Sequence, residues 1–348
     1  MDATLSDEQQ MLADTAAGIA AELAATSTAE LGARDVAAGR RLLAEVGLLS
    51  LRLPTDAGGG ASSAVEVAIV TEELGRRLCA VPFAGPMIAS ELLALAGVDG
   101  DVLASIGAGR RPLTLAVDRS LQDIARGAAG STSIGWDAAG ADEAVGVAGG
   151  PGAGDEEWRP CVRATTGPVV ASVDLTRRLV ALPPSETPRP LGGRLDGEAM
   201  QRWRAFALAV LCADMVGVMA GGLQMAVAYA SQRVQFGRLI GSFQSIQHLC
   251  AEQLVSVEAA RSATYHAAWA VDGLPPSEAL LAARVAKAYV SRHAPMVAEA
   301  VLQVHGGIGH TWESLAHVFL RRALLDRAML GDQSVHLSAI AAHLDGRP

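Results

Sequence analysis

The stretch Tyr229–His248 reads YASQRVQFGRLIGSFQSIQH and joins two long helical patterns. Arg233 and Arg238 flank the tripeptide Gln235-Phe236-Gly237 at the end of the first pattern. A guanidinium fork suits a phosphate or pyrophosphate, and an aromatic face or an amide suits a planar base. On residue types alone, the stretch is either a helix–loop–helix corner with solvated arginines or one half of a nucleotide site.

The composition favours a helical protein with close packing. Half of the 348 residues are apolar, only 4% are aromatic, and alanine and glycine are abundant. The net charge is −9, and Lys287 is the only lysine. An acidic chain without a basic stripe argues against a nucleic-acid partner.

The cysteines indicate a reducing compartment. Cys79, Cys161, Cys212 and Cys250 are scattered in apolar contexts with no CxxC spacing. We therefore expect four buried thiols and, because the first ten residues are acidic and polar, no signal peptide and a cytoplasmic location.

One apolar segment is long enough to cross a bilayer. Ala205–Ala230 contains a single charge, Asp214. The segment is rich in alanine and glycine, and a charge at mid-span would cost roughly 2.5–3.5 kcal/mol. A helix buried on all sides by other helices explains the pattern better, so no membrane association is expected.

The first hundred residues predict a set of helices. Helical spacing covers 5–25, where Ser6 is the N-cap, and continues over 34–47, 63–78 and 86–97. In the third of these helices, Glu72-Glu73 is expected on a solvated outer face.

The next hundred residues change character. Glycines, prolines and short alternating runs over about 101–195 predict strands joined by turns. The clearest runs are Leu113–Val117, Val145–Val147 and Val169–Val173.

The last part is helical again. Helices are predicted over 198–232, 243–272 and 277–304, followed by a last helical region to about 343, and short connections favour an antiparallel four-helix bundle. Gly241 or Ser242 is the predicted N-cap of the second helix. Gly217 and Gly221, four residues apart, allow a neighbouring helix to approach closely in the first.

A second motif follows the third of these helices. Residues 303–309 read QVHGGIG. One glycine would be an ordinary helix end, but three allow the backbone to approach a planar or phosphate group closely. His305 and His310 lack a third ligand at a suitable spacing, so no metal site is expected.

These motifs together resemble the acyl-CoA dehydrogenase family. The first matches R-x-Q-F-G…I-x-x-F-Q-x-I-Q-H, the second matches Q-x-x-G-G-x-G, and Glu72–Arg76 matches the family's EELGR. The resemblance implies a mainly α fold with a small β domain. It divides the chain into an N-terminal helical domain (1–100), a shortened middle β domain (101–195) and a C-terminal four-helix bundle (196–348).

The resemblance also implies FAD as a cofactor shared across a subunit interface. In the family, the first motif reaches the adenine and pyrophosphate end of a neighbouring subunit's FAD, and the glycine turn lies against the same ADP moiety. The residues that carry this implication are Arg233, Gln235, Phe236, Gly237, Gln303, Gly306 and Gly307.

The other half of the family's flavin site is missing. Members that hold their own flavin carry a T-E-x-x-x-G-S-D passage and a W-x-T strand in the middle domain. The corresponding region, Arg110–Gly149, offers only Gly130–Ser133 and Gly135-Trp136-Asp137.

The family's catalytic glutamate is also missing. The family places this base at one of two positions, which correspond here to Leu330 and Ala207. Asp214, two turns beyond Ala207, is either a substitute base or a buried aspartate satisfied by an arginine. Asp332 and Glu313 are weaker candidates.

The sequence therefore predicts the shorter subunit of an α2β2 acyl-CoA dehydrogenase. Its partners would be a larger catalytic acyl-CoA dehydrogenase subunit, an acyl-CoA substrate, for which a steroid or other bulky acyl group is an analogy, and an electron acceptor such as an electron-transfer flavoprotein. Two alternatives remain open at this point: a self-sufficient homo-oligomeric dehydrogenase that uses Asp214 as its base, and a non-catalytic scaffold.

Overall fold

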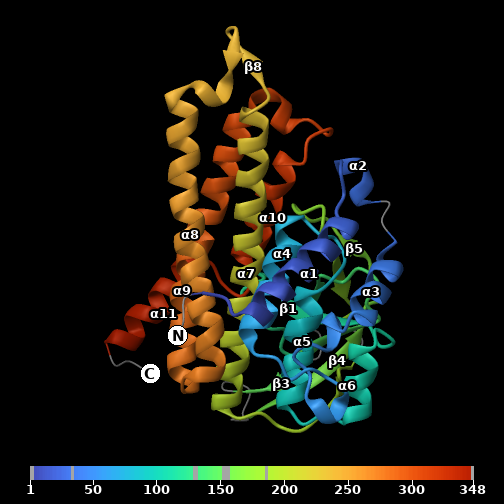
Figure 1. Ribbon diagram of the computed structural model, residues 1–348. Coiled ribbons are helices and arrows are strands. Elements are labelled where there is room, and N and C mark those ends of the chain that lie inside the picture. Colours follow the sequence, from blue (N-terminus) through green and yellow to red (C-terminus); the bar gives the residue numbers. More distant parts are fainter. Residues whose placement is uncertain (1–3, 33–34, 128–131, 151–156, 185–186, 346–348) are drawn as a thin grey trace.

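A computed structural model describes residues 4–32, 35–127, 132–150, 157–184 and 187–345. A tall helical bundle forms one side of the molecule, and a small sheet with the N-terminal helices forms the other (Figure 1). A two-stranded hairpin, labelled β8, projects from the end of the bundle that lies away from the sheet.

Helices form the N-terminal part, as predicted. The bounds are α1 (Asp7–Leu23), α2 (Thr28–Leu31), α3 (Val36–Glu45), α4 (Ala64–Arg76), α5 (Ala84–Leu95) and α6 (Gly100–Gly107). Ser6 caps α1, since its hydroxyl accepts a hydrogen bond from Gln9 N while the Gln9 side chain accepts one from Ser6 N. The short α2 was not predicted, and α6 occupies residues that were assigned to the strand-rich region.

A seven-stranded sheet follows. Its strands are β1 (Leu113–Asp118), β2 (Ser133–Trp136), β3 (Glu143–Gly149), β4 (Trp158–Ala164), β5 (Val169–Val170), β6 (Leu179–Leu182) and β7 (Arg189–Pro190). Their order is β5-β6-β2-β1-β3-β4-β7, and β1 and β3 are the parallel pair. The three predicted runs all fall in strands, although the predicted run Val169–Val173 is a strand only over its first two residues.

The C-terminal part is a helical bundle. Its helices are α7 (Gly197–Ala230), α8 (Gln244–Gly273), α9 (Pro276–His305), α10 (Ala316–Ala328) and α11 (Gln333–Leu344). The fourth bundle helix, α10, packs on α7 and α9 and is less than half as long as either. The predicted cap of α8 was wrong, because the N-cap is Phe243 and the Ser242 hydroxyl instead donates to Leu239 O at 2.7 Å.

Helix α7 runs through the centre of the molecule and packs against α4, α8, α9 and α10. It is long and apolar enough to cross a membrane, but its most apolar 18-residue window is completely buried by other elements. A Cβ on Gly217 would lie 2.1 Å from Glu72 O, and one on Gly221 would lie 2.1 Å from Arg76 O. The backbones of α4 and α7 therefore touch, as the predicted small-residue pair requires.

Two predictions about solvent exposure were wrong, since Glu72 was expected on the surface and Cys250 in the interior. Glu72 is only 2% exposed, because α8 covers α4 and Arg261 and Arg76 pair with its carboxylate at 3.0 and 2.7 Å. Cys250 is half-buried, whereas the other three thiols are buried as expected. In both cases the outcome depends on which helix covers which face, and helical periodicity does not contain that information.

Candidate functional site

The first motif forms a tight hairpin at the end of the bundle. Strand β8 (Val234–Gln235) pairs with β9 (Arg238–Leu239), and Phe236 and Gly237 between them have φ values of +52° and +76°. Two positive φ values identify a type I′ turn, which glycine adopts easily and phenylalanine rarely does. The turn leaves Phe236 92% exposed, so a strained backbone presents a bare aromatic side chain.

The two arginines of this motif differ in the contacts that they make within the chain. Arg238 lies over the Phe243 ring, with its guanidinium carbon 4.2 Å from the ring centroid. Phe243 also meets Phe236 edge to face, with the centroids 6.3 Å apart. In the described part of the chain, no ion pair or side-chain hydrogen bond of Arg233 is found, so its five donors face no acceptor of this chain.

The second motif ends helix α9. Gly306, at φ +62° and ψ −144°, takes a conformation that is essentially restricted to glycine, and its N–H donates to Leu302 O. The chain then turns through a 3₁₀ segment, η4 (Gly306–His310). A Cβ on Gly306 or Gly307 would meet no atom within 4 Å, so their backbone faces open space. Gln303 is exposed on the last turn of α9.

The fold brings the two motifs together around one hollow of about 480 Å³. Four of the predicted site residues line it, namely Arg233, Gln235, Phe236 and Gly306. The other three, Gly237, Gln303 and Gly307, are near neighbours of these in the chain but do not line it. The remaining lining residues are Tyr229, Ile240, Phe243, Ser245, Ile246, Val304 and His305.

Two of these residues form a contact that the sequence did not reveal. The Tyr229 and His305 rings stack with their centroids 4.6 Å apart and an interplanar angle of 21°. They come from the end of α7 and the end of α9, so only the meeting of two helices pairs them. The single signal in the sequence was a histidine directly before the glycine turn.

The chemistry of this wall fits the adenosine diphosphate end of a dinucleotide. It combines a cationic fork, several aromatic faces, an amide, a hydroxyl and glycine backbone. Its size lies within the range of ordinary ligand sites, about 300–1,000 Å³. No carboxylate or thiol lines it. The residues therefore suit binding and offer no carboxylate that could serve as the base.

Three residues of the middle region that were compared with the family's flavin site are enclosed by the fold. Ser133, Trp136 and Asp137 are all buried, with 4%, 0% and 0% exposure. Arg163 donates to the Ser133 hydroxyl at 3.3 Å, and Arg177 pairs with Asp137 at 2.9 Å. Gly130 and Ser131 lie outside the described residues.

The two positions that correspond to the family's base are enclosed and apolar. Ala207 is 0% exposed within α7, and Leu330 is 3% exposed after α10. Leu330 has a φ of +53°, and its N–H donates to Leu121 O at 2.7 Å. Asp332, the weaker candidate nearby, is the N-cap of α11, since its carboxylate accepts from Ser334 N at 2.9 Å.

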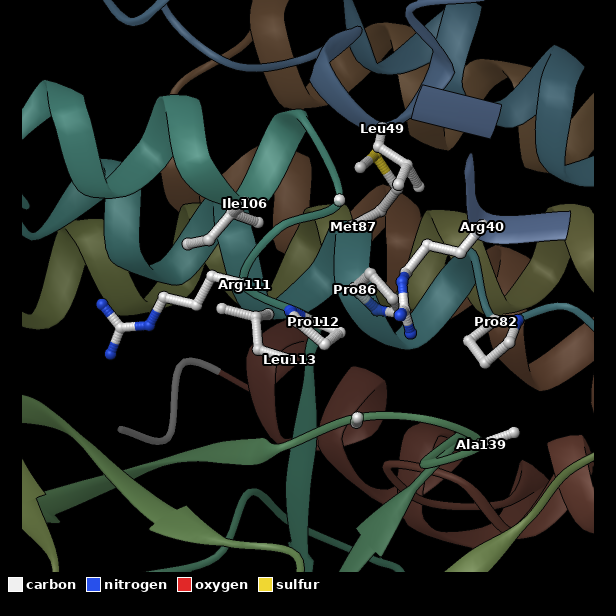
Figure 2. Close-up of a pocket in the computed structure, with 12 residues that line it drawn as sticks. Arg40, Leu49, Pro82, Pro86, Met87, Ile106, Arg111, Pro112, Leu113 and Ala139 are labelled. Carbon is white, nitrogen blue, oxygen red and sulfur yellow. The ribbon is translucent and has the colours of Figure 1, made fainter. Parts of the chain in front are cut away.

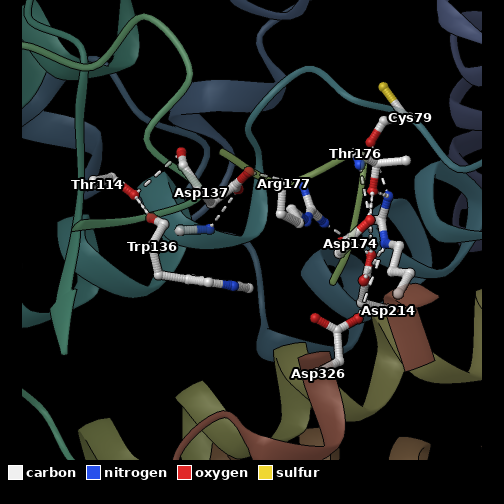
Figure 3. A network of polar contacts seen from close by, with 11 residues as sticks. Cys79, Thr114, Trp136, Asp137, Asp174, Thr176, Arg177, Asp214 and Asp326 are labelled. Atoms are coloured by element: carbon white, nitrogen blue, oxygen red, sulfur yellow. Dashed lines mark hydrogen bonds and ion pairs between the residues drawn. The ribbon is translucent and has the colours of Figure 1, made fainter. Parts of the chain in front are cut away.

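Asp214 lies in a buried ion-pair network (Figure 3). It is 1% exposed, and Arg322 donates to it at 2.8 and 2.5 Å while Arg177 donates at 3.2 Å. Burial alone would raise the pKa of Asp214, but the two guanidinium groups outweigh it and hold the pKa below its usual value. A proton acceptor needs access to its substrate and a suitable pKa, and Asp214 has neither.

The same network connects the three parts of the fold. Arg177, on the connection before β6, pairs with Asp137 after β2 as well as with Asp214 of α7. Arg322 of α10 also donates to Cys79 O, beyond α4, at 2.9 Å. Asp214 is therefore a buried aspartate whose charge is satisfied by arginines. The network holds the sheet and the N-terminal helices against the bundle.

Asp326 lies in the same network, but its carboxyl group is not hydrogen-bonded to an arginine. Within the described residues, no donor lies within hydrogen-bond distance of either of its carboxyl oxygens, and Arg322 Nε is 3.9 Å away. Burial, with the adjacent Asp214 carboxylate, raises the pKa of Asp326 well above its usual value. Loss of the Asp326 proton is therefore disfavoured in the folded protein.

A second hollow lies between the N-terminal helices and the sheet (Figure 2). Pro82, Pro86 and Leu113 line it, and Arg40 at its edge donates to Gly140 O at 2.8 Å. Its volume is about 20 Å³, which is room for a single water molecule and not for a ligand. In the described residues there is also no group of three or more His, Cys, Asp or Glu side chains that could hold a metal ion.

Comparison with known proteins identifies the family. The family model of the acyl-CoA dehydrogenase N-terminal domain matches residues 6–99, and that of the C-terminal domain matches residues 201–344. Acyl-CoA dehydrogenase IpdE2 of Mycobacterium tuberculosis is 32% identical over 92% of this chain and 92% of its own length. This chain belongs to the acyl-CoA dehydrogenase family.

Other members of the acyl-CoA dehydrogenase family differ in length. Acyl-CoA dehydrogenase FadE34 of M. tuberculosis is also 32% identical, over 98% of this chain, but this chain spans only 48% of that relative. Two solved structures share the fold: the Tcur3481-Tcur3483 steroid ACAD G363A variant (TM-score 0.80, 24% identity, 99% of each chain) and the ChsE4-ChsE5 complex from M. tuberculosis (TM-score 0.78, 24% identity, 100% of each chain).

Proposed function

We propose that this chain is the partner subunit of a flavin-dependent acyl-CoA dehydrogenase and completes an FAD site without supplying the catalytic base. One observation carries the proposal. The chain gathers both of its nucleotide motifs around one open hollow, whereas both positions of the family's base hold buried apolar side chains. A half-site of this kind becomes complete only against another protein surface.

In this proposal, the residues that line the hollow between the two motifs bind different parts of FAD. Arg233, which has no acceptor within the described chain, binds the pyrophosphate with its guanidinium fork. The exposed Phe236 and the neighbouring Phe243 cover the base, and the bare backbone of Gly306 lets the ligand approach closely. The bound FAD would supply the hydride acceptor for α,β-dehydrogenation of an acyl-CoA, and the larger subunit would supply the base.

The finer assignments rest on the relatives. A neighbour named as a steroid ACAD supports a steroid-derived or similarly bulky acyl-CoA as the substrate, and a neighbour named as a two-chain complex supports a larger catalytic subunit as the partner. We further propose an electron-transfer flavoprotein as the electron acceptor and a cytoplasmic location, with the free thiols kept reduced.

Loss of flavin from an Arg233→Ala complex tests this proposal. The chain is co-expressed with a larger acyl-CoA dehydrogenase subunit, and the FAD content of the purified complex is measured. Arg233→Ala should release FAD and leave the assembly intact. Arg41→Ala, at an exposed arginine of α3, is the matched control and should retain FAD. Equal FAD retention in both variants would contradict the proposal.

A further inference from the structure

His305 is a mostly buried residue whose second ring nitrogen has no hydrogen-bond partner among the described residues. The residue is 6% exposed and lines the hollow between the hairpin and the glycine turn. Its Nδ1 lies 2.8 Å from Val301 O. A carbonyl oxygen only accepts hydrogen bonds, so Nδ1 carries the proton. The neutral ring therefore has its lone pair on Nε2.

That lone pair is unused. In the described part of the chain, no donor to His305 Nε2 is found, and this nitrogen is not among the fully buried polar atoms, so a donor that enters the hollow can reach it. The ring cannot turn away without losing both the bond to Val301 and the stack on Tyr229. The orientation of the histidine is thus fixed from two sides before any ligand binds.

We propose that His305, held by Tyr229, selects the base of the nucleotide by accepting a hydrogen bond from the exocyclic amine of adenine. This inference rests on the proposed FAD half-site and names its specificity-determining residue. Arg233 is the cation that lines the hollow and takes the phosphates. The aromatic wall is left for the base, and adenine presents an N–H₂ donor at its edge.

The assignment distinguishes adenine from hypoxanthine. Hypoxanthine has a carbonyl oxygen where adenine has the amine. This hydrogen-bond acceptor would face the Nε2 acceptor of His305. A site built to pair with one polar group rejects an analogue that lacks it, because the site's own group is left unsatisfied. For one hydrogen bond, we expect the analogue to bind roughly tenfold more weakly.

Two substitutions at residue 305 separate this role from a structural one. His305→Asn keeps a donor for Val301 O but removes Nε2, and His305→Phe keeps the ring that stacks on Tyr229. Both should bind FAD and its hypoxanthine analogue, deamino-FAD, with equal affinity. Arg41→Ala, at an exposed arginine of α3, is the control and should keep the preference for FAD.

The experiment measures the affinity of FAD and of deamino-FAD for the apo-complex by quenching of flavin fluorescence. A wild-type preference that disappears in both His305 variants supports the inference. FAD binding without any preference, or an equal loss of affinity for both flavins in the variants, overturns the assignment of His305 alone. Failure of the wild-type complex to bind FAD overturns the proposed function as well.

Discussion

At the scale of single residues, the buried network contains two aspartates with opposite effects on stability. Asp214 is paired with two arginines and its pKa is lowered, whereas Asp326 has no hydrogen-bond donor among the described residues and its pKa is raised. The isosteric change to asparagine should therefore destabilise the fold at one position and stabilise it at the other.

Asp214→Asn should lower the free energy of unfolding by about 3–5 kcal/mol, because Arg322 and Arg177 would keep buried charges without a partner. The pKa of Asp214 is lowered on folding, so its contribution is present above the usual carboxyl value of 3.8 and is lost as the pH falls. Urea unfolding at several pH values measures both effects. An unchanged midpoint at neutral pH would contradict the ion-pair account.

Asp326→Asn should raise the free energy of unfolding at neutral pH by about 1 kcal/mol or more, since it imitates the protonated side chain. The pKa of Asp326 is raised on folding, so wild-type stability falls as the pH rises above 3.8, and the variant should lose this slope. Urea unfolding of the wild type and the variant at several pH values measures both the gain in stability and the slope. Destabilisation by this substitution would show that Asp326 is ionised and paired.

At the scale of elements, contact between α4 and α7 depends on glycine. Gly217→Ala would place a Cβ 2.1 Å from Glu72 O and 2.7 Å from Arg76 N, both backbone atoms that cannot move alone. We expect a loss of at least about 1–3 kcal/mol, measured by thermal unfolding. Gly18→Ala in α1, where a Cβ would meet nothing within 4 Å, is the control and should stabilise by about 0.5–1 kcal/mol.

The hairpin gives a second prediction at this scale. Gly237 has a φ of +76°, and a Cβ there would touch no atom within 4 Å, so Gly237→Ala adds backbone strain of about 1–2 kcal/mol and no clash. FAD affinity of the complex should fall about tenfold, while the unfolding temperature falls by no more than a few degrees. A variant that binds FAD as well as the wild type would show that the turn geometry is not needed.

At the scale of the whole molecule, the helices and the family could be predicted from the sequence because their signals are local. Ser6 is a cap that the chain itself encodes, and both motifs are continuous strings. The burial of Glu72, the Tyr229–His305 stack and the raised pKa of Asp326 could not be predicted, since each depends on elements that are distant in the chain. Strands such as β2 and β4 were missed because β2 has only four residues and β4 lacks strict alternation.

The central claim concerns how many chains make one flavin site. The most direct test is the flavin content and native mass of this protein, purified alone and then co-expressed with a larger acyl-CoA dehydrogenase subunit. The account predicts a colourless protein that forms a yellow heterotetramer with one FAD per pair of unlike chains. A yellow homo-oligomer with one FAD per chain would contradict it.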